Sequence, residues 1–167
     1  MNGSGTLHSS VKQDWQTPDD VLDVVRQVGP IGLDPCTVAE NPTGAVCYYT
    51  PTADGLAQGW WPFRTGGWIV YVNPPYGREC AAWVHKAIEE AERGTPIVML
   101  VAARPDSRWG QALLRSANAL CWWRGRIRFR GAPNAAPFPS LFACWNCTGA
   151  FVRAFEPHGV ITQRVVP

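Results

Sequence analysis

The chain has 167 residues, of which 46% are hydrophobic and 17% are charged, a composition that suits one globular domain with a sizeable core. The formal charge of +2 is too small either to indicate or to exclude a partner bound through its phosphates. No run of about 18 apolar residues occurs, so no membrane span is predicted, and residues 1–12 do not resemble a signal peptide. We expect a cytoplasmic protein with a flexible arm at residues 1–12, one domain at residues 13–163 and a tail at residues 164–167.

The six cysteines are expected to be reduced, because a chain with this much core material and no secretion signal does not need disulfides. Cys144 and Cys147 have the spacing of a metal or redox pair. No second Cys or His pair stands at the distance that a zinc finger requires, so we predict no metal site.

The first predicted helix begins after Thr17, which is expected to cap it, with Pro18 at the first helical position. Gly29 ends this helix. Its apolar face consists of Val21, Val24, Val25 and Val28.

The next elements alternate between strand and helix. Strands are expected at residues 31–33, 46–50, 68–72 and 97–101. One helix is expected after Gly77, with an inner face from Trp83 to Ala91 and its end before Gly94, and another around residues 107–116. The last third is richer in predicted strand, at residues 119–123, 127–129, 141–145 and 150–155. This order predicts an α/β sandwich with a mostly parallel sheet and a C-terminal antiparallel hairpin.

Two polar residues, Asp34 and Asn73, directly follow predicted strands. Ligands of open α/β sheets bind at the carboxyl ends of the strands, so we expect both side chains to line one crevice.

The most informative motif is Asn73-Pro74-Pro75-Tyr76, which follows the most apolar strand. The two prolines fix the backbone and leave the Pro74 carbonyl free to accept a hydrogen bond. Together with the Asn73 side-chain oxygen, this carbonyl can hold both hydrogens of a planar amine, while Tyr76 offers a ring for an unstacked base. An ordinary surface turn is the alternative interpretation.

The chain resembles the phage-type DNA N6-adenine methyltransferases, a Dam-like group of class I (Rossmann-like) enzymes that use S-adenosylmethionine. The resemblance covers about residues 14–145 and depends on several weak motifs in the same order. These are Trp15-Gln16-Thr17-Pro18, Leu33-Asp34-Pro35-Cys36, Asp54-Gly55-Leu56, Val72-Asn73-Pro74-Pro75-Tyr76-Gly77, Ala103-Arg104-Pro105-Asp106, Gly125-Arg126-Ile127 and Ala136-Pro137-Phe138-Pro139-Ser140.

The resemblance implies a role for each matching residue. The catalytic and base-holding residues would be Asn73, Pro74, Pro75 and Tyr76. Cofactor-binding residues would be Gln16, Thr17, Pro18, Asp34, Pro35, Cys36, Asp54 and Asn73. DNA, in a phage or prophage setting, is the implied partner, and a homodimer is a candidate assembly.

Two departures from the family pattern affect these expectations. Class I methyltransferases usually place a Gly-rich turn after the first strand, whereas Asp34 leads here into Pro35 and Cys36. Glu40 or Asn41 would then replace the missing backbone contacts. Pro105 also stands where the family pattern leads us to expect Thr.

Arginines between positions 124 and 130 alternate along a predicted strand, which would place them on one face. Arg126 and Arg128 in this run, and Arg104 close to a strand end, are candidates for phosphate contacts. A solvated strand face is the alternative. Phe138 is either a second aromatic residue against the target base or a core residue in a loop.

The predicted function is methyl transfer from S-adenosylmethionine to the N6 amine of adenine in DNA. Cytosine N4, RNA adenine and a glutamine amide are alternative acceptors, because each presents a planar NH2 group. A catalytically inactive DNA-binding relative is the other alternative.

Overall fold

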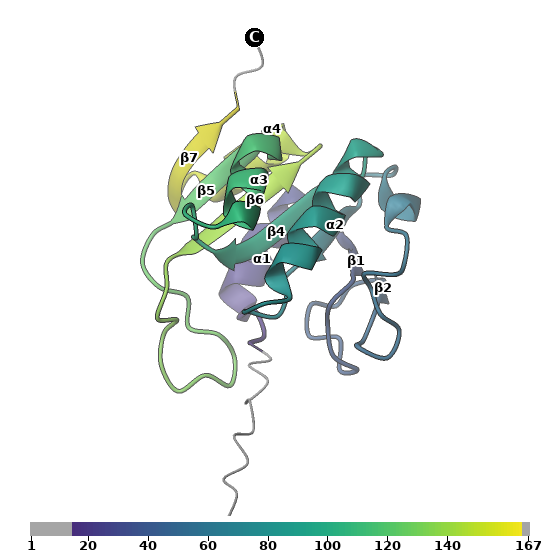
Figure 1. The fold of residues 1–167 in the computed structure, drawn as a ribbon, viewed down its shortest axis with the longest axis horizontal. Coiled ribbons are helices and arrows are strands. Elements are labelled where there is room, and N and C mark those ends of the chain that lie inside the picture. The colour runs from purple at the N-terminus through teal and green to yellow at the C-terminus, as the bar shows by residue number, and fades with distance from the viewer. Residues whose placement is uncertain (1–14, 165–167) are drawn as a thin grey trace, which may run out of the picture.

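A seven-stranded sheet with helices on both faces forms the structure, a computed structural model that describes residues 15–164 (Figure 1). The helices are α1 (Asp19–Val28), α2 (Cys80–Glu92), α3 (Arg108–Ser116) and α4 (Thr148–Phe155), with a 3-10 turn η1 (Trp61–Phe63). The strands are β1 (Ile31–Asp34), β2 (Cys47–Tyr48), β3 (Ile69–Val72), β4 (Ile97–Ala102), β5 (Ala119–Trp123), β6 (Ser140–Trp145) and β7 (Gly159–Gln163). The predicted arm at residues 1–12 and the last three residues of the predicted tail lie outside the described part.

One half of the sheet is parallel. β1 pairs in parallel with β2 and β3, and β3 pairs in parallel with β4. All residues of β1, β3 and β4 are buried, and the uniformly apolar sequence of β3 predicts this for a strand covered on both faces. The carboxyl ends of β1 and β3 therefore lie side by side.

The other half of the sheet is antiparallel, so the prediction of a mostly parallel sheet is wrong. β4 and β6, β5 and β6, and β5 and β7 all pair antiparallel. The chain turns back after β5 through residues 124–139, and β6 thereby enters between β4 and β5 in the reverse direction. The predicted C-terminal hairpin corresponds to β5 and β6.

Two apolar layers hold the helices on the sheet. One layer joins α1 and α4 to one face, and the other joins α2 and α3 to the opposite face. Figure 1 shows α2 and α3 on the near side of the sheet and α1 on the far side. Among residues 15–164, no helix combines the length and apolar character that crossing a bilayer would need.

Four local predictions are corrected. Residues 150–155 belong to α4 and are not a strand, because Phe151, Ala154 and Phe155 repeat at helical spacing and are buried. Residues 127–129 are extended but pair with no strand of the sheet. The strand expected at residues 46–50 is reduced to the two exposed residues of β2. The predicted Thr17 cap is also wrong, since Pro18 occupies the cap position of α1.

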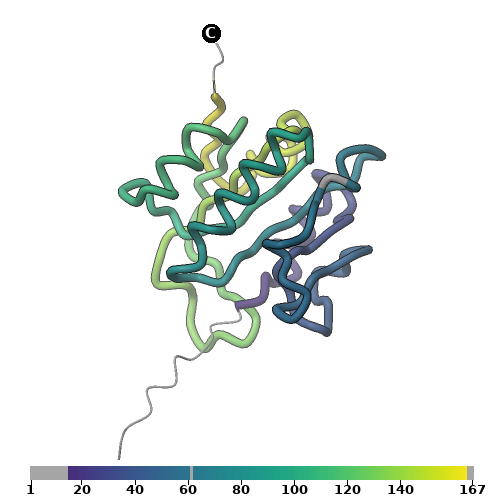
Figure 2. The backbone as a smooth tube through the Cα atoms, turned by 45° about the vertical axis from the view of Figure 1, so that its right-hand side comes forward, coloured from purple at the N-terminus to yellow at the C-terminus, as the bar shows by residue number. Residues whose placement is uncertain are grey.

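The loop of residues 124–139 crosses to the segment that precedes α1. Arg130 donates its main-chain N–H to the Gln16 carbonyl at 2.9 Å and forms an isolated bridge with that residue, and its side chain pairs with Asp19. Figure 2 shows this light-green loop reaching the purple start of the described chain. The loop therefore brings residues of the C-terminal third close to the carboxyl ends of the parallel strands.

Candidate active site

The side-chain amide of Asn73 has a defined orientation at the end of β3. Its nitrogen donates to the Trp15 carbonyl at 2.8 Å and to the Thr17 hydroxyl at 3.2 Å. A carbonyl oxygen can only accept, so the NH2 group must face Trp15. The Asn73 Oδ1 atom consequently points to the other side, where the Tyr76 hydroxyl donates to it at 3.2 Å.

Thr17 connects this amide to β3. Its side chain is only 3% exposed, and its hydroxyl lies 2.8 Å from the Tyr71 hydroxyl. Burial raises the pKa of Tyr71 well above its usual value, so this hydroxyl stays protonated. The interaction explains why Thr17 does not cap α1: its oxygen is used by Asn73 and Tyr71.

An aromatic cluster of Trp15, Tyr76, Phe129 and Phe138 covers the turn. The Tyr76 ring lies 4.8 Å from Phe138, 5.4 Å from Trp15 and 5.6 Å from Phe129, measured between ring centroids. Phe138 also stacks on Trp15 at 5.5 Å. Phe129 is fully buried, whereas Trp15, Tyr76 and Phe138 are only partly buried. Phe138 is thus both packed in a loop and adjacent to the turn of residues 73–76.

Asp34 ends β1 and is 4% exposed. Its carboxylate accepts hydrogen bonds from the Cys36 N–H at 3.2 Å and from the Thr43 hydroxyl at 3.0 Å. Burial raises the pKa of Asp34 from 3.8 to about 6, although these hydrogen bonds act in the opposite direction. Within residues 15–164, no basic side chain forms an ion pair with it.

The carboxyl ends of β1 and β3 are neighbours in the sheet, as the sequence predicts, and a crevice lined by both Asp34 and Asn73 stays a prediction. The Cys36 thiol lies within hydrogen-bonding reach of the Asn73 main chain, and burial and the nearby Asp34 charge raise the pKa of Cys36. Pro74 is buried after Asn73, and Pro75 is exposed at the outer corner of the turn.

The Asp54-Gly55-Leu56 turn packs directly against the loop after β1. A Cβ atom on Gly55 would lie 1.9 Å from the Pro35 carbonyl oxygen, so only glycine permits this approach. Asp54 is exposed, has a φ angle of 51° and accepts the Leu56 N–H at 3.2 Å. The predicted cofactor residues Asp34, Pro35, Cys36 and Asp54 therefore lie on two adjoining loops.

Other predicted cofactor residues lie at different positions. Gln16 and Pro18 flank Thr17 and are partly exposed, whereas Glu40 is exposed on the loop after β1. Asn41 closes that loop by hydrogen bonds to the Ala45 carbonyl and N–H.

Sequence reasoning missed three contributors to the site: Trp15 as a carbonyl acceptor, Thr43 and Tyr71. A fully buried tyrosine hydroxyl needs a partner, so Tyr71 within an apolar strand was the available signal. No comparable sequence signal identifies the Trp15 carbonyl or Thr43.

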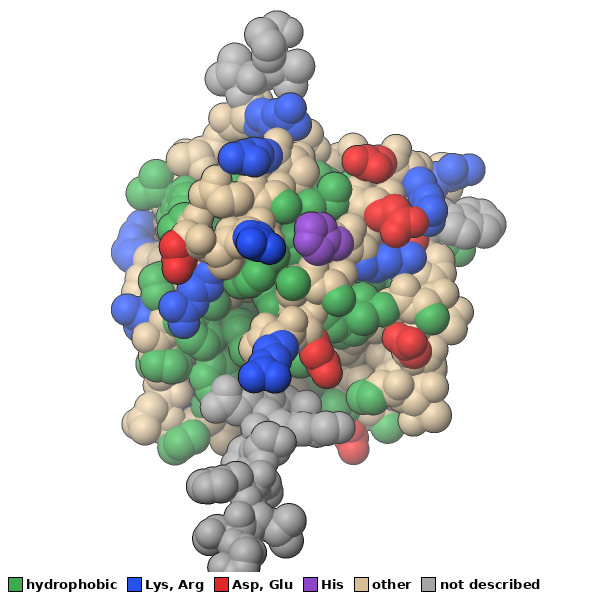
Figure 3. Space-filling view, in the orientation of Figure 1, with side chains coloured by type: hydrophobic (Ala, Val, Ile, Leu, Met, Phe, Trp, Pro, Cys, Tyr) green, Lys and Arg blue, Asp and Glu red, His purple; other side chains and the backbone are tan. Residues whose placement is uncertain are grey.

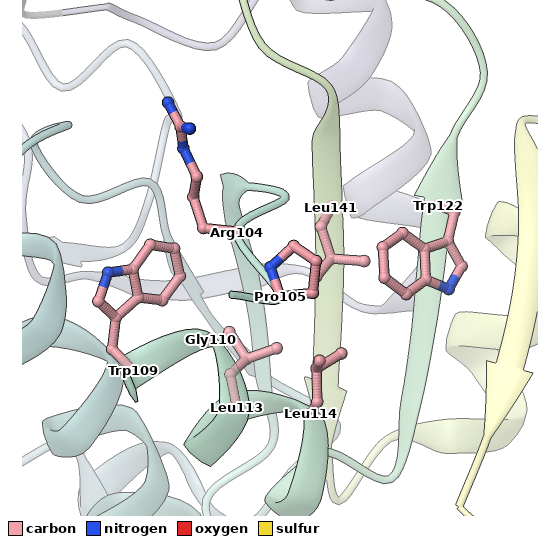
Figure 4. Close-up of a pocket in the computed structure, with 8 residues that line it drawn as sticks. All are labelled: Arg104, Pro105, Trp109, Gly110, Leu113, Leu114, Trp122 and Leu141. Atoms are coloured by element: carbon pink, nitrogen blue, oxygen red, sulfur yellow. The ribbon is translucent and has the colours of Figure 1, made fainter. Parts of the chain in front are cut away.

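Two hollows lie away from these strand ends. One lies beside α3, where Trp109, Trp122 and Leu141 contribute to its lining, and it is too narrow to hold a water molecule. Figure 4 shows the Arg104 side chain extending away from the rings at this hollow. The other, of about 360 Å³, is lined by Arg26, Ile31 and Trp68 near the amino ends of β1 and β3.

The remaining predicted DNA contacts lie on the loop after β5. Arg126 and Arg128 are exposed, while Ile127 and Phe129 between and after them are buried. The alternation that the sequence suggested is present, but the backbone is an extended loop and not a strand. Arg128 donates to the Pro133 carbonyl at 3.3 Å.

Comparison with known proteins places this arrangement in a family. The family model described as DNA N-6-adenine-methyltransferase (Dam) matches residues 4–145. The chain belongs to the Dam family. It is also 30% identical over 116 residues to a protein of Escherichia phage T1 named "DNA N-6-adenine-methyltransferase". That match covers 68% of this chain and 45% of the phage protein, so the chain corresponds to less than half of its relative.

The Dam match includes every residue that the site brings together. It ends at Trp145, the last residue of β6. Both strand ends, the Asp54 turn and the loop with Phe138 lie inside it, whereas α4 and β7 lie beyond it.

Proposed function

We propose that this Dam-family chain transfers a methyl group from S-adenosylmethionine to the N6 amine of adenine in DNA. Membership of the family and the phage relative support this reaction. The bound cofactor would supply an electrophilic methyl group on a sulfonium, and the protein would supply position and hydrogen-bond acceptors.

The orientation of Asn73 carries the proposal. Because both hydrogens of its amide are engaged by Trp15 and Thr17, its oxygen is left for a donor on the outer side of the turn. The adenine amine has two hydrogens, one for Asn73 Oδ1 and one for the Pro74 carbonyl. Two fixed acceptors would favour lone-pair density at nitrogen, directed towards the methyl group.

The target base would stack on Tyr76, with Phe138 nearby. In the structure these rings contact each other, and the Tyr76 hydroxyl donates a hydrogen bond to Asn73 Oδ1. Base entry therefore requires the rings to separate and the tyrosine to release that oxygen. The loop that carries Phe138 is the element we expect to move.

The cofactor would lie between the ends of β1 and β3. Asp34 fits a cationic cofactor, because it is a buried carboxylate with no basic partner among residues 15–164. We assign Pro35, Cys36 and Asp54 to the same wall because Gly55 packs against Pro35. We assign Glu40, Gln16 and Pro18 to the periphery of the same cofactor site.

DNA would approach the face that carries the exposed arginines. Figure 3 shows Lys and Arg side chains around a recessed hydrophobic area on the face of α2 and α3. We assign phosphate contacts to Arg104, Arg126 and Arg128, which are exposed in the structure.

The strand order supports a class I methyltransferase sandwich as the finer description of the fold. β1 to β5 run in one direction, and β6 enters in reverse between β4 and β5. This reversal accounts for the antiparallel pairings of β6 with β4 and β5, while β7 adds a third antiparallel pairing at the edge. The carboxyl ends of β1, β3 and β4 stay on one edge.

Labelled methyl transfer is the direct test. The purified protein would be incubated with methyl-labelled S-adenosylmethionine and with DNA, RNA or protein, and the products would be hydrolysed and identified. We expect N6-methyladenine from DNA. Label in N4-methylcytosine, in RNA or in glutamine would replace the proposed acceptor, and no label in any of them would reject the enzyme.

Asn73→Ala tests the proposed role of the turn. We expect methyl transfer to fall by at least about 100-fold, because one amine acceptor is lost, while calorimetry shows nearly unchanged cofactor affinity. Wild-type turnover in this variant would contradict the assignment.

A further inference from the structure

The segment before α1 does more than line the site, because it also determines which way the Asn73 amide faces. Thr17 and Tyr71 are separated by 54 positions, yet their hydroxyl oxygens lie 2.8 Å apart. Both side chains are almost fully buried. The large majority of buried side-chain hydroxyl groups are hydrogen-bonded, and these two bond to each other.

The three side chains form one chain of hydrogen bonds. Asn73 Nδ2 donates to Thr17 Oγ1 at 3.2 Å, and Thr17 Oγ1 contacts Tyr71 Oη. Tyr71 is fixed in β3, two residues before Asn73. The same strand therefore anchors both the amide and the hydroxyl group that orients it.

We propose that Thr17 and Tyr71 are positioning residues that fix the Asn73 amide with its oxygen towards the target amine. This inference rests on the proposed methyl transfer and names residues that serve it. Without the Thr17 hydroxyl, one amide hydrogen loses its acceptor. Once the base has displaced the Tyr76 hydroxyl from Oδ1, only the Trp15 carbonyl then holds the amide. The amide then samples orientations in which Oδ1 does not face the substrate.

A positioning role of Thr17 can be distinguished by experiment from a direct contact with the cofactor. A residue that touches the cofactor changes its dissociation constant, whereas a residue that orients Asn73 changes the chemical step. Thr17→Val keeps the shape and removes the hydroxyl. Thr17→Ser keeps the hydroxyl and removes a methyl group.

The kinetic experiment measures kcat, KM for DNA and cofactor affinity in four variants. We expect Thr17→Val and Tyr71→Phe to lower kcat by about tenfold, the equivalent of one hydrogen bond, with cofactor affinity unchanged. Thr17→Ser should stay within roughly threefold of wild type, because its hydroxyl still accepts from Asn73.

Thr95→Val is the matched control. Thr95 is also fully buried, and its hydroxyl has no hydrogen-bond partner within residues 15–164. Its replacement tests the loss of a buried hydroxyl remote from the turn, so kcat should not change. If Thr17→Val weakens cofactor binding and leaves kcat unchanged, Thr17 contacts the cofactor and the inference is overturned.

A second measurement does not depend on activity. In cofactor-free protein labelled with 15N-asparagine, the Asn73 side-chain resonances can be assigned by their loss in Asn73→Ala. We expect Thr17→Val to shift these resonances and speed exchange of one amide proton, while Thr95→Val leaves them unchanged. Unaltered Asn73 resonances in Thr17→Val would overturn the inference, whether or not the wild-type protein methylates DNA.

Discussion

The ring and the hydroxyl group of Tyr76 have different positions in the proposed mechanism. In the proposed function the ring is a stacking surface for the base, whereas in the structure the hydroxyl donates to Asn73 Oδ1, the oxygen that the target amine would need. Burial raises the pKa of Tyr76, so the hydroxyl remains a donor at neutral pH. Under the proposed function, the substrate amine would therefore compete with Tyr76 for Asn73 Oδ1.

Replacing Tyr76 by Phe and by Ala separates these roles. Tyr76→Phe keeps the ring and frees Asn73 Oδ1, so we expect kcat/KM for DNA to stay within about threefold of wild type or to rise. Tyr76→Ala should raise KM for DNA by about 10- to 100-fold, because base stacking contributes about 1–3 kcal/mol. Steady-state kinetics check both values, and equal losses in the two variants would show that the hydroxyl itself is required.

Motif residues were predictable at this scale, but their partners were not. Asn73, Pro74 and Tyr76 follow from a rigid turn after a buried strand, which local sequence reveals. Thr17 was expected to cap a helix and to lie beside the cofactor. Its actual partners, Asn73 and Tyr71, come from a distant strand, and short-range patterns contain no information about such contacts.

At the scale of elements, apolar strands were predicted well and short mixed segments were not. β3 and β4 are uniformly apolar and buried, and α2 shows a clear helical repeat. α4 was expected to be a strand because its short apolar run also fits an extended pattern. β7 was missed because it is a largely exposed edge strand without a buried face.

The close contact of Gly55 with the loop after β1 can be tested by substitution. In Gly55→Ala, the new methyl group would meet the Pro35 carbonyl, forcing the turn away from the loop after β1. We expect the free energy of unfolding to fall by about 1–3 kcal/mol and cofactor affinity to weaken.

Gly149→Ala is the control for this substitution. In α4 a Cβ atom at position 149 would have only an ordinary contact, 3.6 Å from the Arg153 side chain. The free energy of unfolding should rise by up to about 1 kcal/mol, because alanine favours helix. Denaturant titration measures both variants, and equal stabilities would mean that the two loops do not depend on their close contact.

At the scale of the whole molecule, the two halves of the sheet contribute different parts of the site. The parallel half supplies Asp34 and Asn73 at neighbouring strand ends, which the α/β pattern predicted. The antiparallel half supplies Phe138 through the loop between β5 and β6. The sequence made Phe138 a candidate aromatic residue at the site, but not its contact with Tyr76. That contact depends on a reversal of chain direction and on the bridge between Arg130 and Gln16, which local sequence does not contain.

Asp34 links the stability of the whole molecule to the proposed function. Its pKa is about 6 in the folded protein against an ordinary value of 3.8, because burial disfavours the charge. Between these values the folded state binds more protons than the unfolded state, so stability falls as pH rises from about 4 to 6. Above about pH 6 the full penalty, about 3 kcal/mol, is present.

Asp34→Asn should therefore stabilise the protein and impair it at the same time. The asparagine amide has no charge to bury. We therefore expect the free energy of unfolding of Asp34→Asn to exceed that of the wild type by nearly zero at pH 4 and by about 3 kcal/mol at pH 7. A cationic cofactor would offset this penalty in the wild type, so the variant should bind S-adenosylmethionine more weakly. Denaturant titrations across pH and calorimetry check both effects. Parallel stability curves for the two proteins would show that burial of Asp34 does not destabilise the fold, and equal affinities would remove Asp34 from the cofactor site.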